Sequence, residues 1–168
     1  MLPTFKPSPL LAAFRDFVLK RLGLDPSPPS DRRIVLIRRS ASRRIANEAA
    51  IVAALAVLGH EVEVVDFATL SYEAQIAAVL KARVLIGVHG AGLTNLLWLQ
   101  DNAAVVEIFT SPAWMPAGYG NLAAWRGVRW ATCHREAVTA EPSRPGGASD
   151  AISVDVAAIT ATVAPLLT

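Results

Sequence analysis

Two loops of this sequence carry residues suited to binding an anion. The first, RRSASRR at 38–44, has four arginines and no acid. Guanidinium groups form charge-assisted, often paired hydrogen bonds with phosphate, so the loop indicates an anionic ligand. The expected phosphate-binding residues are Arg38, Ser42 and Arg44, with Arg39 and Arg43 expected to face solvent. A solvated basic loop without a ligand is the alternative interpretation.

The second loop, HGAGLTN at 89–95, is rich in glycine. Gly90 and Gly92 allow a ligand to approach the backbone closely, and a helix start supplies N–H donors for a phosphate. The expected ligand contacts are Gly90, Ala91, Gly92, Leu93, Thr94 and Asn95. Asn95 stands where the dinucleotide fingerprint GxGxxG has its third glycine, which disfavours NAD. His89 is a candidate catalytic residue, or a structural histidine at a strand end.

Glu107 lies within the apolar run VVEIF. A buried carboxylate without a partner is costly, so its presence in a strand calls for a role. Binding a ribose or acting in catalysis is one interpretation, and an ion pair with an arginine is the other. Asn47 and Glu48, at a helix start, either cap that helix or support the arginines. Trp114 lies in a loop and could cover a base, whereas Cys133 and His134 are expected to be structural.

Apolar runs alternate with amphipathic ones along the chain. Strands are predicted at 33–37, 61–67, 83–88, 104–109 and 128–132; helices are predicted at 10–22, 45–58, 71–81, 118–126 and about 154–166, with a glycine turn and short helix at 90–99. Gly59 and Ser71 are expected helix caps. This alternation predicts an α/β fold, a Rossmann-like parallel sheet with helices on both faces. Both loops then follow strands at the ligand-binding edge.

Composition narrows the class of protein. The 168 residues are 53% hydrophobic and 18% charged, which excludes a disordered chain. A single cysteine excludes an internal disulfide framework. No transmembrane segment or signal peptide is evident, so a cytoplasmic location is expected, with peripheral membrane association left open. A net charge of +2 is too balanced for a general nucleic-acid surface.

The chain is expected to divide into two parts. Residues 1–31 form a helix followed by a proline-rich linker, DPSPPSD at 25–31. Residues 32–168 form the Rossmann-like nucleotide-sugar-binding domain, which contains a proline- and glycine-rich loop at 141–147.

Several segments, taken in order, resemble glycosyltransferase family 61. They are RRSASRRIANE, LSYEAQIAAVLKARVLIGVHGAGLTNLLWL and AAVVEIF, and the resemblance covers about residues 32–135. It implies an inverting, metal-free enzyme with two Rossmann domains (GT-B type). Such an enzyme transfers xylose, arabinose or N-acetylglucosamine from a UDP-sugar to a glycan or polysaccharide. By resemblance, Arg38 and Arg44 hold the diphosphate with Gly90–Thr94, His89 lies near the diphosphate or sugar, and Glu107 lies near the ribose.

The length departs from that family pattern. The chain has no room for a second Rossmann domain, so it is expected to be the C-terminal, donor-binding half of a larger enzyme. A separate N-terminal half or a second copy would be its partner, and the catalytic base could lie there. A non-catalytic nucleotide-binding module, or a structural fragment that binds no nucleotide, are the alternatives.

Overall fold

The computed structural model describes residues 6–26, 33–110, 118–133, 138–140 and 151–168. Most of the predicted linker at 25–31, the predicted loop at 141–147, Trp114 and His134 lie outside these residues.

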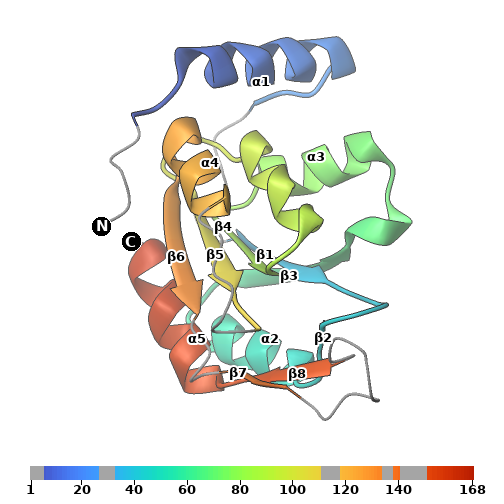
Figure 1. Cartoon of the computed structure of the whole chain (residues 1–168), viewed down its shortest axis with the longest axis vertical. Helices are drawn as coiled ribbons and strands as arrows, with labels where there is room; N and C mark the ends of the chain where they lie inside the picture. Colours follow the sequence, from blue (N-terminus) through green and yellow to red (C-terminus); the bar gives the residue numbers. More distant parts are fainter. Residues whose placement is uncertain (1–5, 27–32, 111–117, 134–137, 141–150) are drawn as a thin grey trace.

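A five-stranded parallel sheet forms the centre of the molecule (Figure 1). Its strands are β1 (Arg33–Arg38), β3 (Glu61–Asp66), β4 (Val84–Val88), β5 (Ala104–Ile108) and β6 (Arg129–Cys133). They lie in the order β3-β1-β4-β5-β6, and each neighbouring pair is parallel. The predicted α/β class and the five predicted strands are therefore confirmed.

Helices cover both faces of the sheet. α2 (Glu48–Val57) and α5 (Val156–Val163) lie on one face; α3 (Tyr72–Leu80), the 3-10 helix η2 (Ala91–Trp98) and α4 (Gly118–Arg126) lie on the other (Figure 1). Two short 3-10 turns, η1 (Phe67–Thr69) and η4 (Ala164–Leu166), follow β3 and α5. No helix among the described residues combines the length and apolar character that a membrane span requires.

Local signals account for most helix boundaries. Ser71 accepts a hydrogen bond from the Ala74 N–H, as predicted for an N-cap, and Gly59 has a φ of +82° just beyond α2. The last helix begins later than predicted because Asp155 caps it, accepting from Ala157 and Ala158.

A second, small sheet was not predicted from the sequence. It consists of β2 (Arg44–Ile45), β8 (Ala151–Val154) and β7 (Val138–Ala140), in the order β2-β8-β7. Because Arg44 and Ile45 pair with β8, α2 begins at 48 rather than at the predicted 45. The side chain of Asn47 exchanges two hydrogen bonds with the Val154 backbone, which fastens this sheet to the start of α2.

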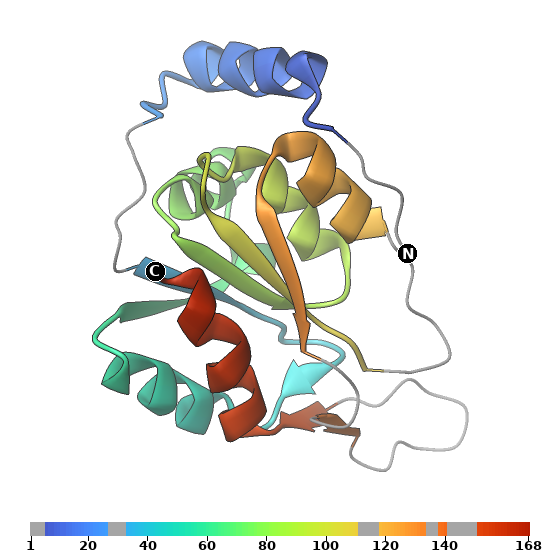
Figure 2. The same cartoon turned by 90° about the vertical axis from the view of Figure 1, so that its left-hand side faces the viewer.

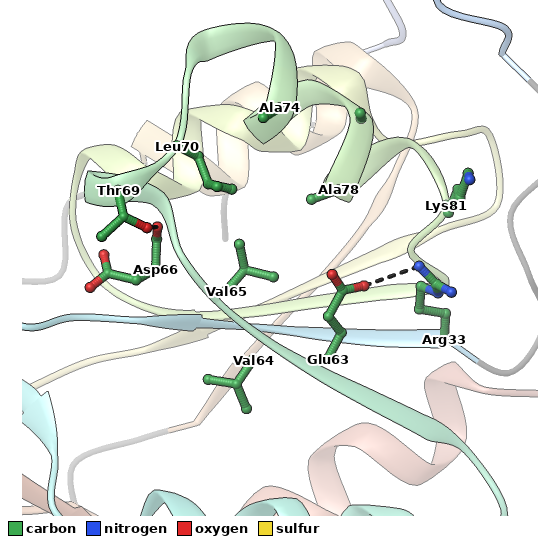
Figure 3. Close-up of a pocket in the computed structure, with 11 residues that line it drawn as sticks. Arg33, Glu63, Val64, Val65, Asp66, Thr69, Leu70, Ala74, Ala78 and Lys81 are labelled. Carbon is green, nitrogen blue, oxygen red and sulfur yellow. Dashed lines mark hydrogen bonds and ion pairs between the residues drawn. The ribbon is translucent and has the colours of Figure 1, made fainter.

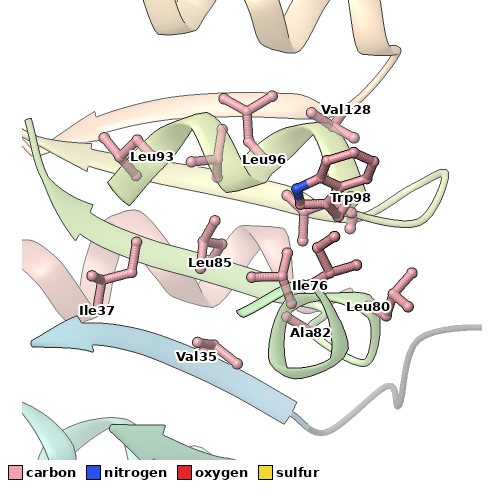
Figure 4. Close-up of a cluster of buried hydrophobic side chains, with 14 of the residues drawn as sticks. Val35, Ile37, Ile76, Leu80, Ala82, Leu85, Leu93, Leu96, Trp98 and Val128 are labelled. Atoms are coloured by element: carbon pink, nitrogen blue, oxygen red, sulfur yellow. The ribbon is translucent and has the colours of Figure 1, made fainter. Parts of the chain in front are cut away.

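Alternation along the strands produces two buried clusters. Ile34 and Leu36 of β1 pack against α2 and α5, whereas Val35 and Ile37 pack toward α3 and η2. Figure 4 shows the second cluster, in which Trp98 of η2 lies among aliphatic side chains from the sheet and α3. Burial on both faces explains why the inner strands β1, β4 and β5 have almost continuously apolar sequences.

α1 (Pro9–Leu22) lies outside the α3, η2 and α4 layer (Figure 2). Its Leu19 is 1% exposed and joins the second cluster. Arg15 is also buried and donates to Gln100 Oε1 at 2.7 Å. The opposite side of the helix exposes Leu10, Phe14 and Phe17, so α1 is attached to the body by a single face.

Truncating the two faces of α1 should have different effects. Leu19→Ala should lower the free energy of unfolding by about 2–4 kcal/mol, because it leaves a cavity in the core. Phe17→Ala, a change of similar kind at a side chain that is 63% exposed, should alter it by less than about 0.5 kcal/mol. Urea denaturation followed by tryptophan fluorescence measures both values. Equal losses would contradict the packing of α1.

Candidate functional site

The order of the sheet reverses between β1 and β4. After β1 the chain moves to β3 on one side, then crosses back to place β4 on the other side. The helix that follows β1, α2, covers one face, and the helix that follows β4, η2, covers the opposite face. Ligands of open α/β sheets bind in the crevice outside such a reversal. The arginine loop (38–44) and the glycine turn (89–92) both begin there.

Arg39 and Arg43 bring their guanidinium groups to the glycine turn. Arg43 Nη1 donates to the carbonyl oxygen of His89 at 2.6 Å, and Arg39 Nε donates to the Ser42 carbonyl at 2.9 Å. A Cβ on Gly90 would collide with Arg39 Nη1 and lie 3.4 Å from Arg43 Nη2. Gly90 also has φ 156° and ψ 175°, a conformation that side chains rarely adopt.

These two arginines form a positive pair without an acidic partner. Among the described residues, neither guanidinium lies within ion-pair distance of a carboxylate. Burial, and then the neighbouring charge of Arg43, lowers the pKa of Arg39 from its usual value. Arg43 is moreover a non-glycine residue at φ 55°, which costs free energy. A strained, half-buried cation pair of this kind is suited to an anionic ligand.

The predicted orientations of the four arginines are reversed in the structure. Arg38 points toward α2, because it shares a side of β1 with Ile34 and Leu36, and it pairs with Glu48 at 2.5 Å. Arg44 is exposed on β2, where Ile45 takes the inward position. The glycine turn is therefore contacted by Arg39 and Arg43, the two arginines that were expected to face solvent. One of the two interpretations of Glu48 was that it supports the arginines of the loop. It does pair with an arginine, but with Arg38, which does not contact the glycine turn.

Asp66 at the end of β3 holds the arginine loop from the other side. Ser40 donates a hydrogen bond to Asp66 Oδ2, and Oδ1 accepts from the Ala68 N–H. The Ser40 hydrogen bond is the main reason why the pKa of Asp66 lies below its usual value. Asp66 was not identified from the sequence, although an acid at the end of a strand beside the arginine loop was the available signal. Ser42 contributes its backbone carbonyl to Arg39.

The residues that follow Gly90 divide between surface and core. Ala91 and Thr94 are exposed and Gly92 is half-buried, so they remain near the turn, whereas Leu93 is fully buried. Asn95 is buried and donates to Gln75 Oε1 on α3 at 3.2 Å and to the Gly92 carbonyl. Leu93 and Asn95 therefore shape the turn from beneath, because their side chains are directed away from a ligand at the surface.

His89 and Glu107 lie side by side on one face of the sheet. His89 Nδ1 is 2.5 Å from Glu107 Oε1, and Trp130 Nε1 donates to Glu107 Oε2 at 3.0 Å. The His89 ring stacks on Phe109 with a centroid separation of 5.5 Å and meets Tyr119 edge-on. Glu107 is 0% exposed with both oxygens occupied, so the predicted ribose contact does not fit this geometry. His89, 13% exposed, is the member of the pair that a ligand can reach.

A separate groove of about 510 Å³ runs along β3 and α3 (Figure 3). Alanines and Leu70 line it, with Asp66 at one end and the Arg33–Glu63 ion pair at the other. Of the residues that the structure describes, none from the arginine loop or the glycine turn lines this groove. Two acids, Glu63 and Asp66, and two bases, Arg33 and Lys81, line the groove, so it has no excess of positive charge to attract a phosphate.

Cys133, at the end of β6, is 2% exposed. Burial, and then the nearby Asp155, raises the pKa of its thiol to about 11. A protonated, covered thiol is neither a nucleophile nor a metal ligand. Across the described ranges, no three His, Cys, Asp or Glu side chains are grouped as a metal site would need.

Comparison with known proteins assigns the family. A family model described as Glycosyltransferase 61 matches residues 3–106, a range that includes α1, the arginine loop and the glycine turn. The chain belongs to the glycosyltransferase 61 family. The family that the sequence was expected to resemble over about residues 32–135 is thus confirmed. The matched range begins earlier than expected, at residue 3, and ends at residue 106.

Family 61 relatives of this chain include proteins named EGF domain-specific O-linked N-acetylglucosamine transferase. The one from Drosophila melanogaster is 38% identical over 128 residues, which cover 74% of this chain and 24% of the relative. Those from Pan troglodytes and Gallus gallus are each 36% identical, over 76% and 73% of the chain. The chain spans about a quarter of the length of these relatives.

The buried thiol yields a simple chemical test of this part of the fold. At about pH 8 a thiol with a pKa near 11 is almost wholly protonated, so Cys133 should react at least about a hundredfold more slowly in the native protein than in the denatured one. A colour-forming thiol reagent, with and without guanidinium chloride, measures both rates. Similar rates in the two states would show that the end of β6 is open to solvent.

Proposed function

We propose that this chain is the donor-binding part of a glycosyltransferase and binds the diphosphate of a UDP-sugar between β1 and β4. The main observation in support of this proposal is that the guanidinium groups of Arg39 and Arg43 both point to Gly90. Among the described residues, neither has a carboxylate partner. The place of this pair at the reversal of strand order supports the proposal. Membership of the glycosyltransferase 61 family supports the class of reaction.

The proposed chemistry stabilises the leaving group. In inverting transfer an acceptor oxygen attacks the anomeric carbon while the bond from that carbon to the phosphate oxygen breaks. Negative charge then grows on UDP, and Arg39 and Arg43 would neutralise it together with the backbone N–H groups of the glycine turn. As the family resemblance implies, the cations in this proposal are side chains rather than a metal ion.

The proposed donor is UDP-N-acetylglucosamine, and the proposed acceptor is a protein hydroxyl or a glycan. The donor and the protein hydroxyl follow from relatives named EGF domain-specific O-linked N-acetylglucosamine transferase, and the glycan is the acceptor that the family resemblance implies. A second Rossmann domain of a GT-B enzyme, as a separate chain or a longer polypeptide, would supply the acceptor side and the base. A second copy of this chain is the other candidate partner, and the cytoplasmic location stays a prediction.

A binding module without transferase activity is the second candidate function. The observation in its favour is that Glu107, the acid beside His89, is fully buried with both oxygens occupied and is therefore not placed to act as a base toward an acceptor. Incubation with UDP-N-acetylglucosamine and an EGF-domain acceptor, with released UDP as readout, separates the two. Acceptor-dependent UDP release establishes the transferase, whereas UDP binding without release establishes the module.

Removing either inward arginine should weaken UDP binding. Arg39→Ala and Arg43→Ala should each cost about 1.5–3 kcal/mol in binding free energy, the range for charge-assisted hydrogen bonds. Arg44→Ala is the matched control, because it removes the same charge from an exposed position and should cost much less. Isothermal calorimetry with UDP provides the affinities. If Arg44→Ala lowered the affinity for UDP as much as the other two substitutions, UDP would be bound by a general basic surface and not by a specific site.

The glycine turn should not tolerate a side chain. Gly90→Ala should lower the free energy of unfolding by about 1–3 kcal/mol, since its backbone conformation favours glycine, and it should weaken UDP binding by displacing Arg39. Gly118→Ala, at a glycine with no neighbour within 4 Å of an added Cβ, should leave UDP affinity unchanged. Thermal denaturation and calorimetry measure the two effects. Unchanged UDP affinity in Gly90→Ala would separate the turn from the site.

A further inference from the structure

The imidazole of His89 is held on several sides. Glu107 contacts Nδ1 at 2.5 Å, Phe109 stacks on the ring at an interplanar angle of 18°, and Tyr119 meets the ring at 62°. The backbone carbonyl of the same residue accepts from Arg43. A ring held in this way has one orientation, and its position is tied to that of the cation pair.

The hydrogen bonds at Glu107 indicate which nitrogen of the His89 ring carries a proton. The indole N–H of Trp130 can only donate, so Glu107 Oε2 is an acceptor. An ionised carboxylate accepts at both oxygens, and Glu107 is fully buried, where a charge needs a close partner. The geometry is satisfied when His89 Nδ1–H donates to Oε1.

We propose that Glu107 is a positioning residue, which holds His89 through Nδ1 and thereby fixes the orientation in which the imidazole presents Nε2 to the nucleotide. With Nδ1 directed at Glu107, Nε2 is the ring nitrogen on the side away from the carboxylate. Glu107 acts through His89 and does not touch the ligand.

The position of the ring supports a contact with phosphate. Tyr119 borders the His89 ring, and it also lies near enough to Arg39 to influence its pKa. Arg43 is hydrogen-bonded to the His89 backbone. The backbone of His89 and the neighbouring Tyr119 thus connect the imidazole to the cation pair, on which the proposed function rests.

The first test reads the protonation of His89 directly. The chain has three histidines, so long-range 1H–15N correlation spectra of histidine-labelled protein contain few ring signals to assign. His89 should carry a proton on Nδ1, alone or on both nitrogens. A neutral ring protonated only on Nε2 would overturn the proposal without any substitution.

The second test asks whether Glu107 acts through His89. Glu107→Gln leaves two donors, His89 and Trp130, facing one amide oxygen, so it should raise the dissociation constant for UDP about tenfold or more. His89→Ala should raise it by a similar factor, and Glu107→Gln should add almost nothing in the His89→Ala background. Trp130→Phe, which leaves the carboxylate in place, should change the constant by less than about threefold.

The outcomes distinguish this inference from the proposed function. If wild-type protein binds UDP but the Glu107 and His89 effects multiply independently, Glu107 is structural and the positioning role is wrong. If wild-type protein does not bind UDP, the proposed function itself fails. Far-UV circular dichroism of each variant verifies folding, and the wild-type spectrum decides the protonation of His89 even where a variant does not fold.

Discussion

Two like charges held side by side destabilise a protein unless something opposes them. Arg39 and Arg43 are placed in this way at the end of β1, half-buried, with no carboxylate close enough to pair with them in the described residues. Coulomb repulsion at short range, and the loss of hydration, both favour an anion between or above them. Much of the surrounding structure acts to keep the two guanidinium groups in this arrangement.

Three neighbouring segments hold the two arginines in place against their mutual repulsion. Asp66 holds the loop through Ser40, and Glu48 holds Arg38 away from the turn. The turn itself is supported from below by Asn95, whose amide bridges the Gly92 carbonyl and Gln75. Gln75 in turn donates to the carbonyls of Phe67 and Leu70. The family motif residues Gln75 and Asn95 thus stabilise the site without facing it.

The far end of η2 is fixed by two buried arginines. Arg126 of α4 donates to the carbonyls of Leu97 and Leu99, and Arg15 of α1 donates to Gln100. Unpaired carbonyls at the end of a helix need such partners, because burying them unsatisfied is costly. The outer helix α1 therefore contributes to the position of η2, whose other end forms the glycine turn. This contact gives a physical reason for α1 to belong to the segment that the family shares.

The sheet was predictable because its inner strands β1, β4 and β5 are buried on both faces and read as apolar runs, whereas the edge strand β3 alternates. The small second sheet was not, since β2 has two residues and its partner β8 lies more than a hundred residues later. The orientation of Arg38 could have been predicted from the alternation of side chains along a strand. Ile34, Leu36 and Arg38 lie on the same side of β1, so Arg38 is directed to α2. The same alternation places Gly87 opposite Glu107, and hence His89 beside it.

The register of β4 and β5 connects the core to the chemistry. Since Gly87 pairs with Glu107, His89 follows two residues further along on the same side of the sheet, and its ring reaches the carboxylate. The space beside Gly87 itself is filled by Ile37 and Leu93. That ring is reached by solvent, while its carboxylate is not. The backbone of His89 then holds Arg43. A single residue at the end of β4 therefore transmits the position of a buried acid to both an imidazole and a guanidinium, and a shift of register by one residue would separate all three.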